Sequence, residues 1–319
     1  MRLDDYGSLT FTPLVRAQKQ KIGISVRDGE GWKYSYNLAL RKKFDNHWTV
    51  WGTYGSYYRM PSWYEIFGDG VNLVSRWYEF NSVSNWGPDV YAEKGKNWDV
   101  SAEWNGRALG SDGDVTLTYF HRKSKNLLTT VFNPLWGDTW YANLGAGWIE
   151  GVELSGKMHW KQWDFSTSAT WQNSLVTSGH VAYQNTGSTG GWQGQPLPWT
   201  PKWTVNSRVD YRFPGEKLSF FAEYNWTDKL PWFNNGGEGA YYTAMGLFNV
   251  GMKYSLNKQF KITAGVNDIG NKGPKQMLYS RVESGSDGID INTGLPSNIR
   301  NVAYPQQGRT YYATLEYTF

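Results

Sequence analysis

Residues 309–319, RTYYATLEYTF, decide the fold. Tyr311, Ala313, Leu315, Tyr317 and Phe319 alternate there with threonines, a glutamate and one further tyrosine. Successive side chains of a β-strand point to opposite faces, so a period of two indicates a strand. The stretch therefore predicts a strand with one mainly apolar face and one mainly polar face.

The same alternation recurs upstream in about a dozen segments of roughly 9–14 residues, the length with which a tilted strand crosses a bilayer. Clear examples are 32–40, 48–54, 98–105, 203–213, 220–226, 248–256 and 260–267.

The connections between these segments alternate in length. Short ones are expected at 42–46, 106–113, 161–162, 214–216 and 257–258, and long ones at 61–90, 132–139, 177–201, 231–240 and 270–308. Outer-membrane barrels have tight periplasmic turns and longer extracellular loops. The sequence therefore predicts an all-β, antiparallel transmembrane β-barrel of about a dozen strands, with Phe319 at the periplasmic end.

The amino-acid composition restricts the classes of function that we expect for the chain. Aromatic residues make up 17% of the chain, with 19 tryptophans, as suits a surface that is apolar at one end and wet at the other. The net charge is only +4 and forms no basic block, which argues against a nucleic-acid partner. The chain has no cysteine, and His47, His121, His159 and His180 lack ligand spacing. We expect no enzyme activity, no metal and no cofactor.

Six short motifs then carry a resemblance. They are Arg59-Met60-Pro61-Ser62 with Glu65-Ile66-Phe67-Gly68, Gly87-Pro88-Asp89-Val90 with Glu93 to Trp98, Asn143-Leu144-Gly145 with Gly151-Val152-Glu153-Leu154, Pro196-Leu197-Pro198 with Pro201, Val266-Asn267-Asp268-Ile269, and Gln307-Gly308-Arg309 with Phe319. In this order they resemble the TonB-dependent outer-membrane receptors, and ferric siderophore receptors most. The resemblance extends from about residue 22 to the C-terminus.

The resemblance implies a barrel of about 22 strands around an N-terminal plug. Residues 1–319 would be the C-terminal portion of that barrel, with the plug and the signal peptide absent from this chain. The implied location is the outer membrane of a Gram-negative cell. The implied partners are outer-membrane lipid, the missing N-terminal plug and barrel half, the inner-membrane TonB complex acting through that plug, the barrel-assembly machinery and a small-molecule ligand.

The motif residues are expected to be structural. They are Arg59, Pro61, Glu65, Asn143, Gly151, Glu153, Asn267, Gly308, Arg309 and Phe319. Glu153 shares the polar face with Ser155, Lys157 and His159, and we expect it to join a charge network in the barrel lumen. Gly145 and Gly147 are expected to mark a bulge or a close approach of the backbone.

Aromatic and basic residues in the long loops are the candidate ligand site. We single out Arg76, Trp77, Tyr78, Trp86, Trp192, Tyr279, Arg281 and Arg300. Flat rings and guanidinium groups suit an anionic aromatic ferric siderophore. The alternatives are a passive porin-like channel, a receptor for an oligosaccharide, and a soluble tryptophan-rich carbohydrate-binding module. Haem receptors of the family commonly carry an axial histidine after the Arg-x-Pro motif, and residues 61–88 contain none.

Overall fold

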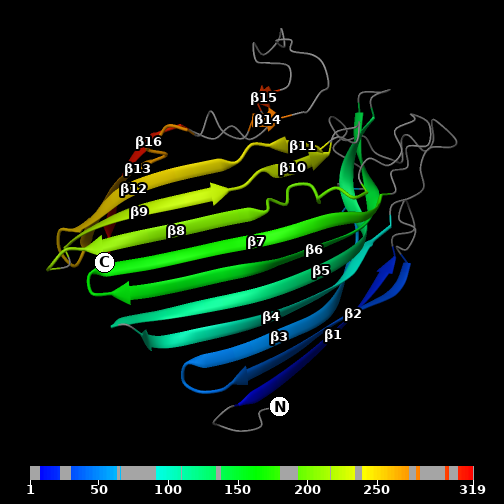
Figure 1. The fold of residues 1–319 in the computed structure, drawn as a ribbon, viewed down its shortest axis with the longest axis horizontal. Coiled ribbons are helices and arrows are strands. Elements are labelled where there is room, and N and C mark those ends of the chain that lie inside the picture. Colours follow the sequence, from blue (N-terminus) through cyan, green and yellow to red (C-terminus); the bar gives the residue numbers. More distant parts are fainter. Residues whose placement is uncertain are drawn as a thin grey trace.

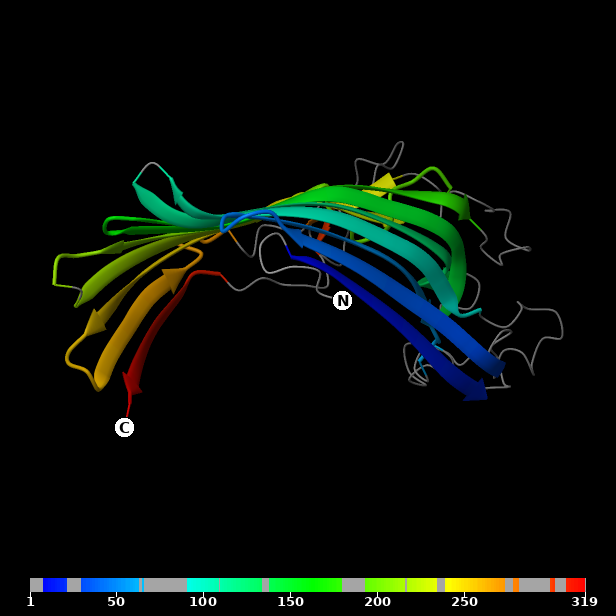
Figure 2. The same cartoon turned by 90° about the horizontal axis from the view of Figure 1, so that it is seen from below.

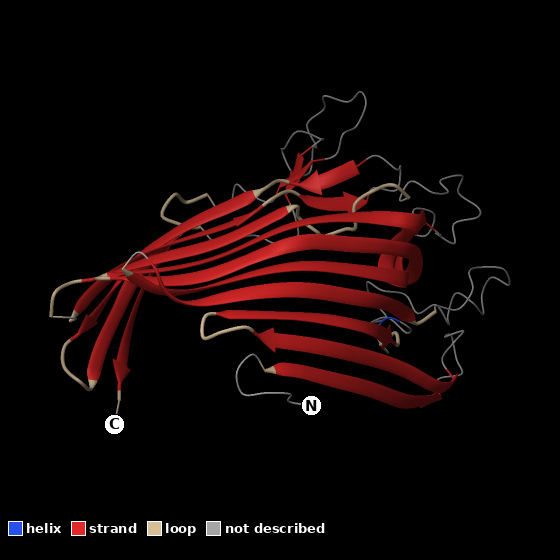
Figure 3. Ribbon diagram, turned by 60° about the horizontal axis from the view of Figure 1, so that its bottom comes forward, coloured by secondary structure: helices blue, strands red, loops and turns tan. Residues whose placement is uncertain are grey.

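The computed structural model describes residues 8–21, 30–62, 65, 91–108, 110–133, 138–179, 193–215, 217–233, 239–272, 278–280, 299–301 and 308–318. These residues lie almost entirely in strands and turns (Figure 3). No helix among them is long and apolar enough to span a membrane.

Twelve antiparallel strands of the described chain form one sheet, and they follow chain order from edge to edge (Figure 1). They are β1 (Leu9–Lys21), β2 (Glu30–Lys43), β3 (Trp48–Arg59), β4 (Glu93–Ala108), β5 (Ser111–Asn133), β6 (Asp138–Trp160), β7 (Trp163–Gly179), β8 (Trp203–Arg212), β9 (Leu218–Thr227), β12 (Met245–Ser255), β13 (Phe260–Asn267) and β16 (Thr310–Tyr317). This confirms the predicted antiparallel fold of about a dozen strands.

The burial of the two faces is the reverse of that in a soluble protein. Apolar side chains on one face are exposed, including Tyr34 at 68%, Val100 at 50% and Tyr311 at 71%. On the other face Ser101 and Ser174 are only 2% and 6% exposed. Water-soluble proteins cover apolar side chains and expose polar ones. We call the two sides the apolar face and the polar face, and the apolar face is suited to lipid.

Short turns join the strands at one end of the sheet, at the left in Figure 1. In the turn between β2 and β3, the backbone amides of His47 and Trp48 both donate to the Asp45 carboxylate at 2.7 Å. These two bonds lower the pKa of Asp45. Asn257 accepts from the amides of Gln259 and Phe260 in the same way between β12 and β13. Asp and Asn favour turns because they make such local bonds.

Three features differ from the sequence-based prediction. The strands β5 and β6 continue to Asn133 and Asp138, so the long connection expected at 132–139 is much shorter. Within the predicted loops lies a second sheet of β10 (Leu230–Phe233), β11 (Gly239–Tyr242), β14 (Leu278–Ser280) and β15 (Ile299–Asn301). The first strand, β1, was not singled out in the sequence.

The sheet is strongly bent but not closed (Figure 2). The described part of the chain contains no ladder between β1 and β16, so each is an edge strand. An edge strand presents a row of backbone amides and carbonyls that can pair with another strand.

Candidate functional site: the loop-bearing rim

Most of the family-like motifs gather at the end of the sheet opposite the short turns, while Gly151-Val152-Glu153-Leu154 lies in the middle of β6. We call this end the rim: it comprises the ends of β3 to β7, β13 and β16 that lead into the long connections. These motifs are spread over most of the chain. Strand pairing brings them together at the rim, where their side chains form hydrogen bonds with the bases of the loops.

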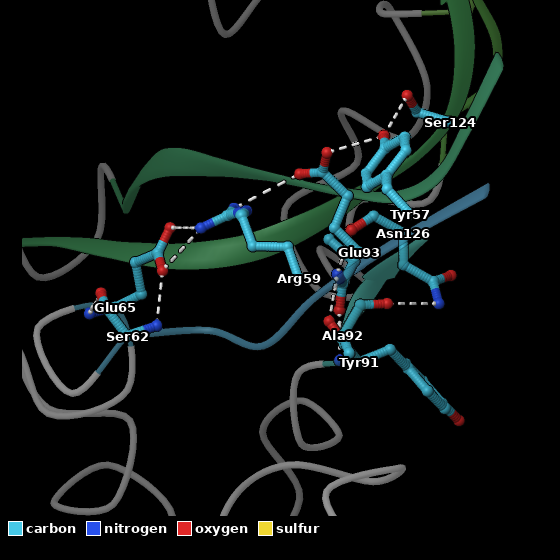
Figure 4. A network of polar contacts seen from close by, with 10 residues as sticks. Tyr57, Arg59, Ser62, Glu65, Tyr91, Ala92, Glu93, Ser124 and Asn126 are labelled. Carbon is cyan, nitrogen blue, oxygen red and sulfur yellow. Dashed lines mark hydrogen bonds and ion pairs between the residues drawn. The ribbon is translucent and has the colours of Figure 1, made fainter. Parts of the chain in front are cut away.

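Arg59, the last residue of β3, bridges two carboxylates (Figure 4). Its guanidinium donates to both oxygens of Glu65, at 2.9 and 3.0 Å, and to Glu93 at 3.3 Å. Glu65 begins the connection after β3 and Glu93 begins β4. Both bonds to Glu65 come from Nη1 and the bond to Glu93 comes from Nη2, so the bridge ties the two ends of the 60–92 connection to each other through charge-assisted hydrogen bonds.

Ser62 and Glu65 cap each other beside this bridge. The Ser62 amide donates to the Glu65 carboxylate at 2.7 Å, and the Glu65 amide donates to the Ser62 hydroxyl at 3.2 Å. This reciprocal pair is the arrangement of a capping box. Burial alone would raise the pKa of Glu65, but the bonds from Ser62 and Arg59 bring it below its ordinary value. Pro61, which precedes Ser62, is buried.

Tyr57 extends the network across the polar face. Its hydroxyl donates to Glu93 at 2.9 Å and lies 2.5 Å from the Ser124 hydroxyl on β5. An added Cβ at Gly95 would come within 2.2 Å of the Lys123 carbonyl oxygen and within 2.6 Å of the Tyr57 ring. Glycine at this position of β4 therefore allows close approach of both the β5 backbone and the ring.

Asn143 on β6 holds the other end of the same connection. Its side-chain oxygen accepts from the Tyr91 amide at 2.7 Å, and its amide group donates to the carbonyls of Tyr91 and Asn126 at 3.0 and 2.7 Å. Asn126 in turn donates to the Ala92 carbonyl at 3.2 Å. Asn143 thus supplies the bonds that a paired strand would otherwise make to Tyr91.

A bulge sits directly behind Asn143 and confirms the role predicted for the glycines. The β5–β6 register shifts around Leu127, and the β6–β7 register shifts between Ala146 and Gly147. Gly145 has a φ of 117°, which side-chain-bearing residues rarely adopt. A Cβ on Gly147 would lie 2.9 Å from the Leu175 carbonyl oxygen. A β-bulge bends the strand and so changes the direction of the residues at the rim.

The proline-containing segment 196–201 is bound to β7. The Leu197 amide donates to the Ser174 hydroxyl at 3.0 Å, and Ser174 also bonds the Thr200 hydroxyl at 2.9 Å. Gln172 donates to the Pro201 carbonyl at 2.8 Å. These contacts hold the base of the 177–201 connection against the polar face at the rim.

The last two motifs meet where the final connection begins and ends. Arg309 donates from its side chain to the Ile269 carbonyl at 2.6 Å, and its amide donates to the Asn271 side chain at 2.9 Å. Asp268, which is 3% exposed and has a φ of 48°, accepts from the Lys272 amide at 3.0 Å. Gly308 accepts from the Thr310 hydroxyl at 3.0 Å.

Charged networks on the polar face lie farther down the strands. Arg208 binds Asp210 at 2.6 Å and also pairs with Glu223. Arg212 pairs with Asp164 at 2.8 Å, and His159 contacts the same carboxylate at 2.7 Å. These groups line the side that faces the interior of a closed barrel.

Glu153 does not behave as expected. It lies on the polar face opposite Thr118, but it is exposed and makes no ion pair with the residues that the structure describes. Gly151 beside it is buried, and a Cβ there would lie 2.8 Å from the Phe120 ring. The absence of a side chain at Gly151 therefore lets the Phe120 ring lie against the backbone there.

The other predicted residues can be placed only in part. Arg76, Trp77, Tyr78, Trp86, Trp192, Arg281 and Phe319 lie outside the described residues. Tyr279 and Arg300 are backbone partners in the β14–β15 ladder. Asn267 ends β13 opposite Thr310. Sequence reasoning missed Tyr57, Tyr91, Ser124 and Asn126, whose spacing gives no signal of the contacts they make.

Comparison with known proteins agrees with this arrangement. Residues 2–269 match the family model for the "TonB dependent receptor-like, beta-barrel" domain. The chain is 24% identical over 309 residues to the probable TonB-dependent siderophore receptor PirA of Acinetobacter baumannii, which covers 92% of this chain and 39% of that protein. It is 23% identical to the hemoglobin-haptoglobin utilization protein B of Neisseria meningitidis, over 97% of this chain and 40% of that protein.

Among solved structures, a ferric enterobactin receptor variant (PfeA) from Pseudomonas aeruginosa in complex with enterobactin superposes with a TM-score of 0.65 at 20% identity. The match covers 100% of this chain and 44% of that chain. The chain thus spans about two fifths of the length of the curated relatives it matches. The match of the family model over most of the sequence shows that the chain belongs to the TonB-dependent receptor β-barrel family.

Proposed function

We propose that this chain is the C-terminal barrel portion of an outer-membrane receptor that takes up a ferric siderophore, driven by the TonB complex. The single observation that carries the proposal is the pairing of an exposed apolar face with a polar face whose rim binds the bases of the loops. A sheet with this arrangement separates lipid from a polar lumen and displays its loops at one end.

The two edge strands support the proposal that the complete barrel contains further strands. Unpaired backbone groups cannot persist in hydrocarbon, so β1 and β16 must find partners in the membrane. The N-terminal barrel half of the family would supply those partners and the plug that the TonB complex moves. Arg208, Asp210 and Arg212 lie on the face that the plug would contact.

The ligand class rests on relatives and on loop composition. The Acinetobacter protein is named as a siderophore receptor, and the Pseudomonas protein is named as a ferric enterobactin receptor. In this chain, Arg76 directly precedes Trp77 and Tyr78 in the sequence, and the backbones of Tyr279 and Arg300 pair in the β14–β15 ladder. Loops that contain both guanidinium groups and aromatic rings suit an anionic aromatic chelate. The mechanism is capture by the loops followed by rearrangement of the plug, without catalysis.

Haem is a second candidate because one relative is named for hemoglobin-haptoglobin utilization. Residues 61–88 contain no histidine, and His180 is the nearest candidate in a loop. Imidazole is a common protein ligand of haem iron. A Soret shift on haem titration that disappears in His180→Ala would favour haem over a siderophore.

Transport by the complete receptor tests the proposal. In a strain without its own siderophore receptors, the complete receptor should import iron supplied as a ferric catecholate, and a protonophore should abolish the import. Uptake that is insensitive to the protonophore, together with conductance in a planar bilayer, would instead identify a passive channel.

A further inference from the structure

Three polar side chains meet on the polar face beside the turn between β6 and β7. His159 is the last polar-face residue of β6, Asp164 lies directly opposite it on β7, and Arg212 ends β8. The Nδ1 atom of His159 lies 2.7 Å from Oδ1 of Asp164. Nη2 of Arg212 lies 2.9 Å from the same nitrogen and 3.0 Å from the same oxygen. We call these three residues the turn triad.

The three contacts cannot all be hydrogen bonds at the same time. Nδ1 of His159 either carries a hydrogen or presents a lone pair. With a hydrogen it donates to Asp164 and has no lone pair with which to accept from Arg212. Without a hydrogen it accepts from Arg212, and its contact with the Asp164 carboxylate brings two acceptors together. In acid the imidazole carries a hydrogen on both nitrogens, so only the bond to Asp164 is then possible.

Few other contacts fix the guanidinium of Arg212. Its Nη2 also lies 2.8 Å from Oδ2 of Asp164, but its Nε is buried without a hydrogen-bond partner in the described chain. A buried donor without a partner is unfavourable. Asp210, the residue opposite Asp164, is held by two bonds from Arg208 at 2.6 and 2.7 Å. The position of the Arg212 guanidinium therefore depends on His159 and Asp164.

Other charged groups face the turn triad from β5 and β6. Asp112 lies opposite His159 on β5 and is 3.9 Å from Arg107 of β4. Lys157 and Lys161 lie two residues to either side of His159. Within the described ranges, none of these four groups forms a salt bridge with a member of the turn triad. The hydrogen-bond arrangement is therefore decided by the three members themselves and by the proton on the imidazole.

We propose that the turn triad is a proton-operated switch in the lumen wall. While His159 is neutral, its Nδ1 accepts from Arg212, and the guanidinium bridges His159 and Asp164. When His159 gains a proton, it donates to Asp164, and its positive charge repels the guanidinium from the bridge. Histidine is the side chain that ordinarily changes charge between about pH 5 and 8. The three side chains are 45, 41 and 39% exposed, so protons reach them from solvent.

The switch changes the charge that the lumen wall presents near the short turns. Once released, Arg212 displays a permanent positive charge on the polar face, because a guanidinium does not lose its proton in proteins. This consequence rests on the proposed function, which places the short turns in the periplasm and a plug against the polar face. The exchange of hydrogen bonds depends only on the three side chains, so it can be measured without ligand or transport.

Nitrogen NMR of the complete receptor, with isotope-labelled arginine, tests the proposal. The Nη signals of Arg212 are identified by their loss in Arg212→Lys. At about pH 8 the two signals should be separate, because the bridge stops rotation of the guanidinium, and at about pH 5 they should merge. In His159→Gln, which keeps an acceptor for Arg212 but gains no charge, they should stay separate. In Asp164→Asn, which removes the carboxylate, they should be merged at both pH values.

The matched control is His47→Gln. His47 also lies beside a short turn, but its Nδ1 contacts the carbonyl oxygen of Asn105 at 2.8 Å instead of a charged pair. This variant should keep the wild-type change. Heat-modifiable gel mobility verifies folding, and if one triad variant does not fold, the other carries the test.

Three results would each overturn the proposal: wild-type signals that do not differ between the two pH values, a pH response that persists in either triad variant, or a response that disappears in His47→Gln. Loss of iron uptake beside an intact NMR response would count only against the proposed function.

Discussion

The side chain of Asn143 forms two hydrogen bonds with the backbone of Tyr91, accepting from its amide and donating to its carbonyl. In this way β6 reaches past β5 and binds the residue that leads into β4. The two strands are not neighbours in the sheet, so this contact stiffens the rim across the ladder.

Asn143→Ala should weaken the rim, because it removes three bonds and leaves the Tyr91 amide without this acceptor. We expect a loss of about 1–3 kcal/mol, at about 1 kcal/mol per hydrogen bond. The measurement is the temperature at which the complete receptor loses its heat-modifiable gel mobility. Asn225→Ala, on the polar face of β9, is the control, and an equal shift in both variants would contradict the specific role of Asn143.

Acid should loosen the connection that Arg59 and Glu65 hold. The folded-state pKa of Glu65 lies below its ordinary value of 4.5, so its contacts stabilise the rim fully above that pH. Their contribution is lost as the pH falls through the lower folded-state pKa. The expected size is on the order of 1 kcal/mol, because Arg59 is partly exposed. A spin label at Met60, which begins the connection and makes none of these contacts, should gain mobility on acidification, whereas Glu65→Gln should show the mobile spectrum at every pH.

The long connections should be accessible from outside the cell. The chain has no cysteine, so single cysteines at Ser188 or Ser286 give unambiguous labelling sites. We expect both to react with an impermeant maleimide on intact cells, and cysteines at Asn46 or Gly215 in the short turns to react only after lysis. The opposite pattern would invert the proposed orientation.

The 319-residue chain expressed alone should not support energised uptake. It contains no plug of the family's kind in its described residues, and β1 and β16 remain edges. In a receptor-deleted strain, accumulation of iron from a ferric catecholate should match that of the empty vector. Protonophore-sensitive accumulation above that background would show that the parts needed for energy coupling are present after all.

Removing two loop guanidinium groups should weaken siderophore binding. We expect Arg76→Ala with Arg281→Ala in the complete receptor to lose about 1–3 kcal/mol per charge-assisted contact with a ferric catecholate. Tryptophan fluorescence quenching measures the affinity, and Lys157→Gln with Lys261→Gln, two exposed lysines on the polar face, serves as a charge-matched control. Tight binding of an oligosaccharide that is unchanged in the double variant would refute the siderophore assignment.

Much of the twelve-stranded sheet could be predicted from the sequence, because apolar and polar residues alternate with a period of two along its strands. The strands β12 and β13 were found close to their true ends for this reason. The extension of β5 and β6 was missed because the bulges around Leu127 and Gly147 reset the alternation. β14 and β15 are too short to show a period.

The motifs of the rim could be recognised in the sequence, but the contacts that their side chains make could not be predicted. Arg59 and Glu65 belong to one motif and were expected to be structural, but the ion pair between them was not predicted. The hydrogen bonds of Asn143 with Tyr91 and of Tyr57 with Ser124 join residues that are far apart in the sequence. No periodic pattern in the sequence indicates such contacts. Glu153 illustrates the converse, since sharing a face with charged residues did not give it an ion-pair partner in the described chain.

The strand order of the large sheet follows the order of the chain without a crossover (Figure 1). No strand has to be threaded between two others that are already paired. Assembly can therefore proceed one hairpin at a time from either margin, with each step closing only a local loop.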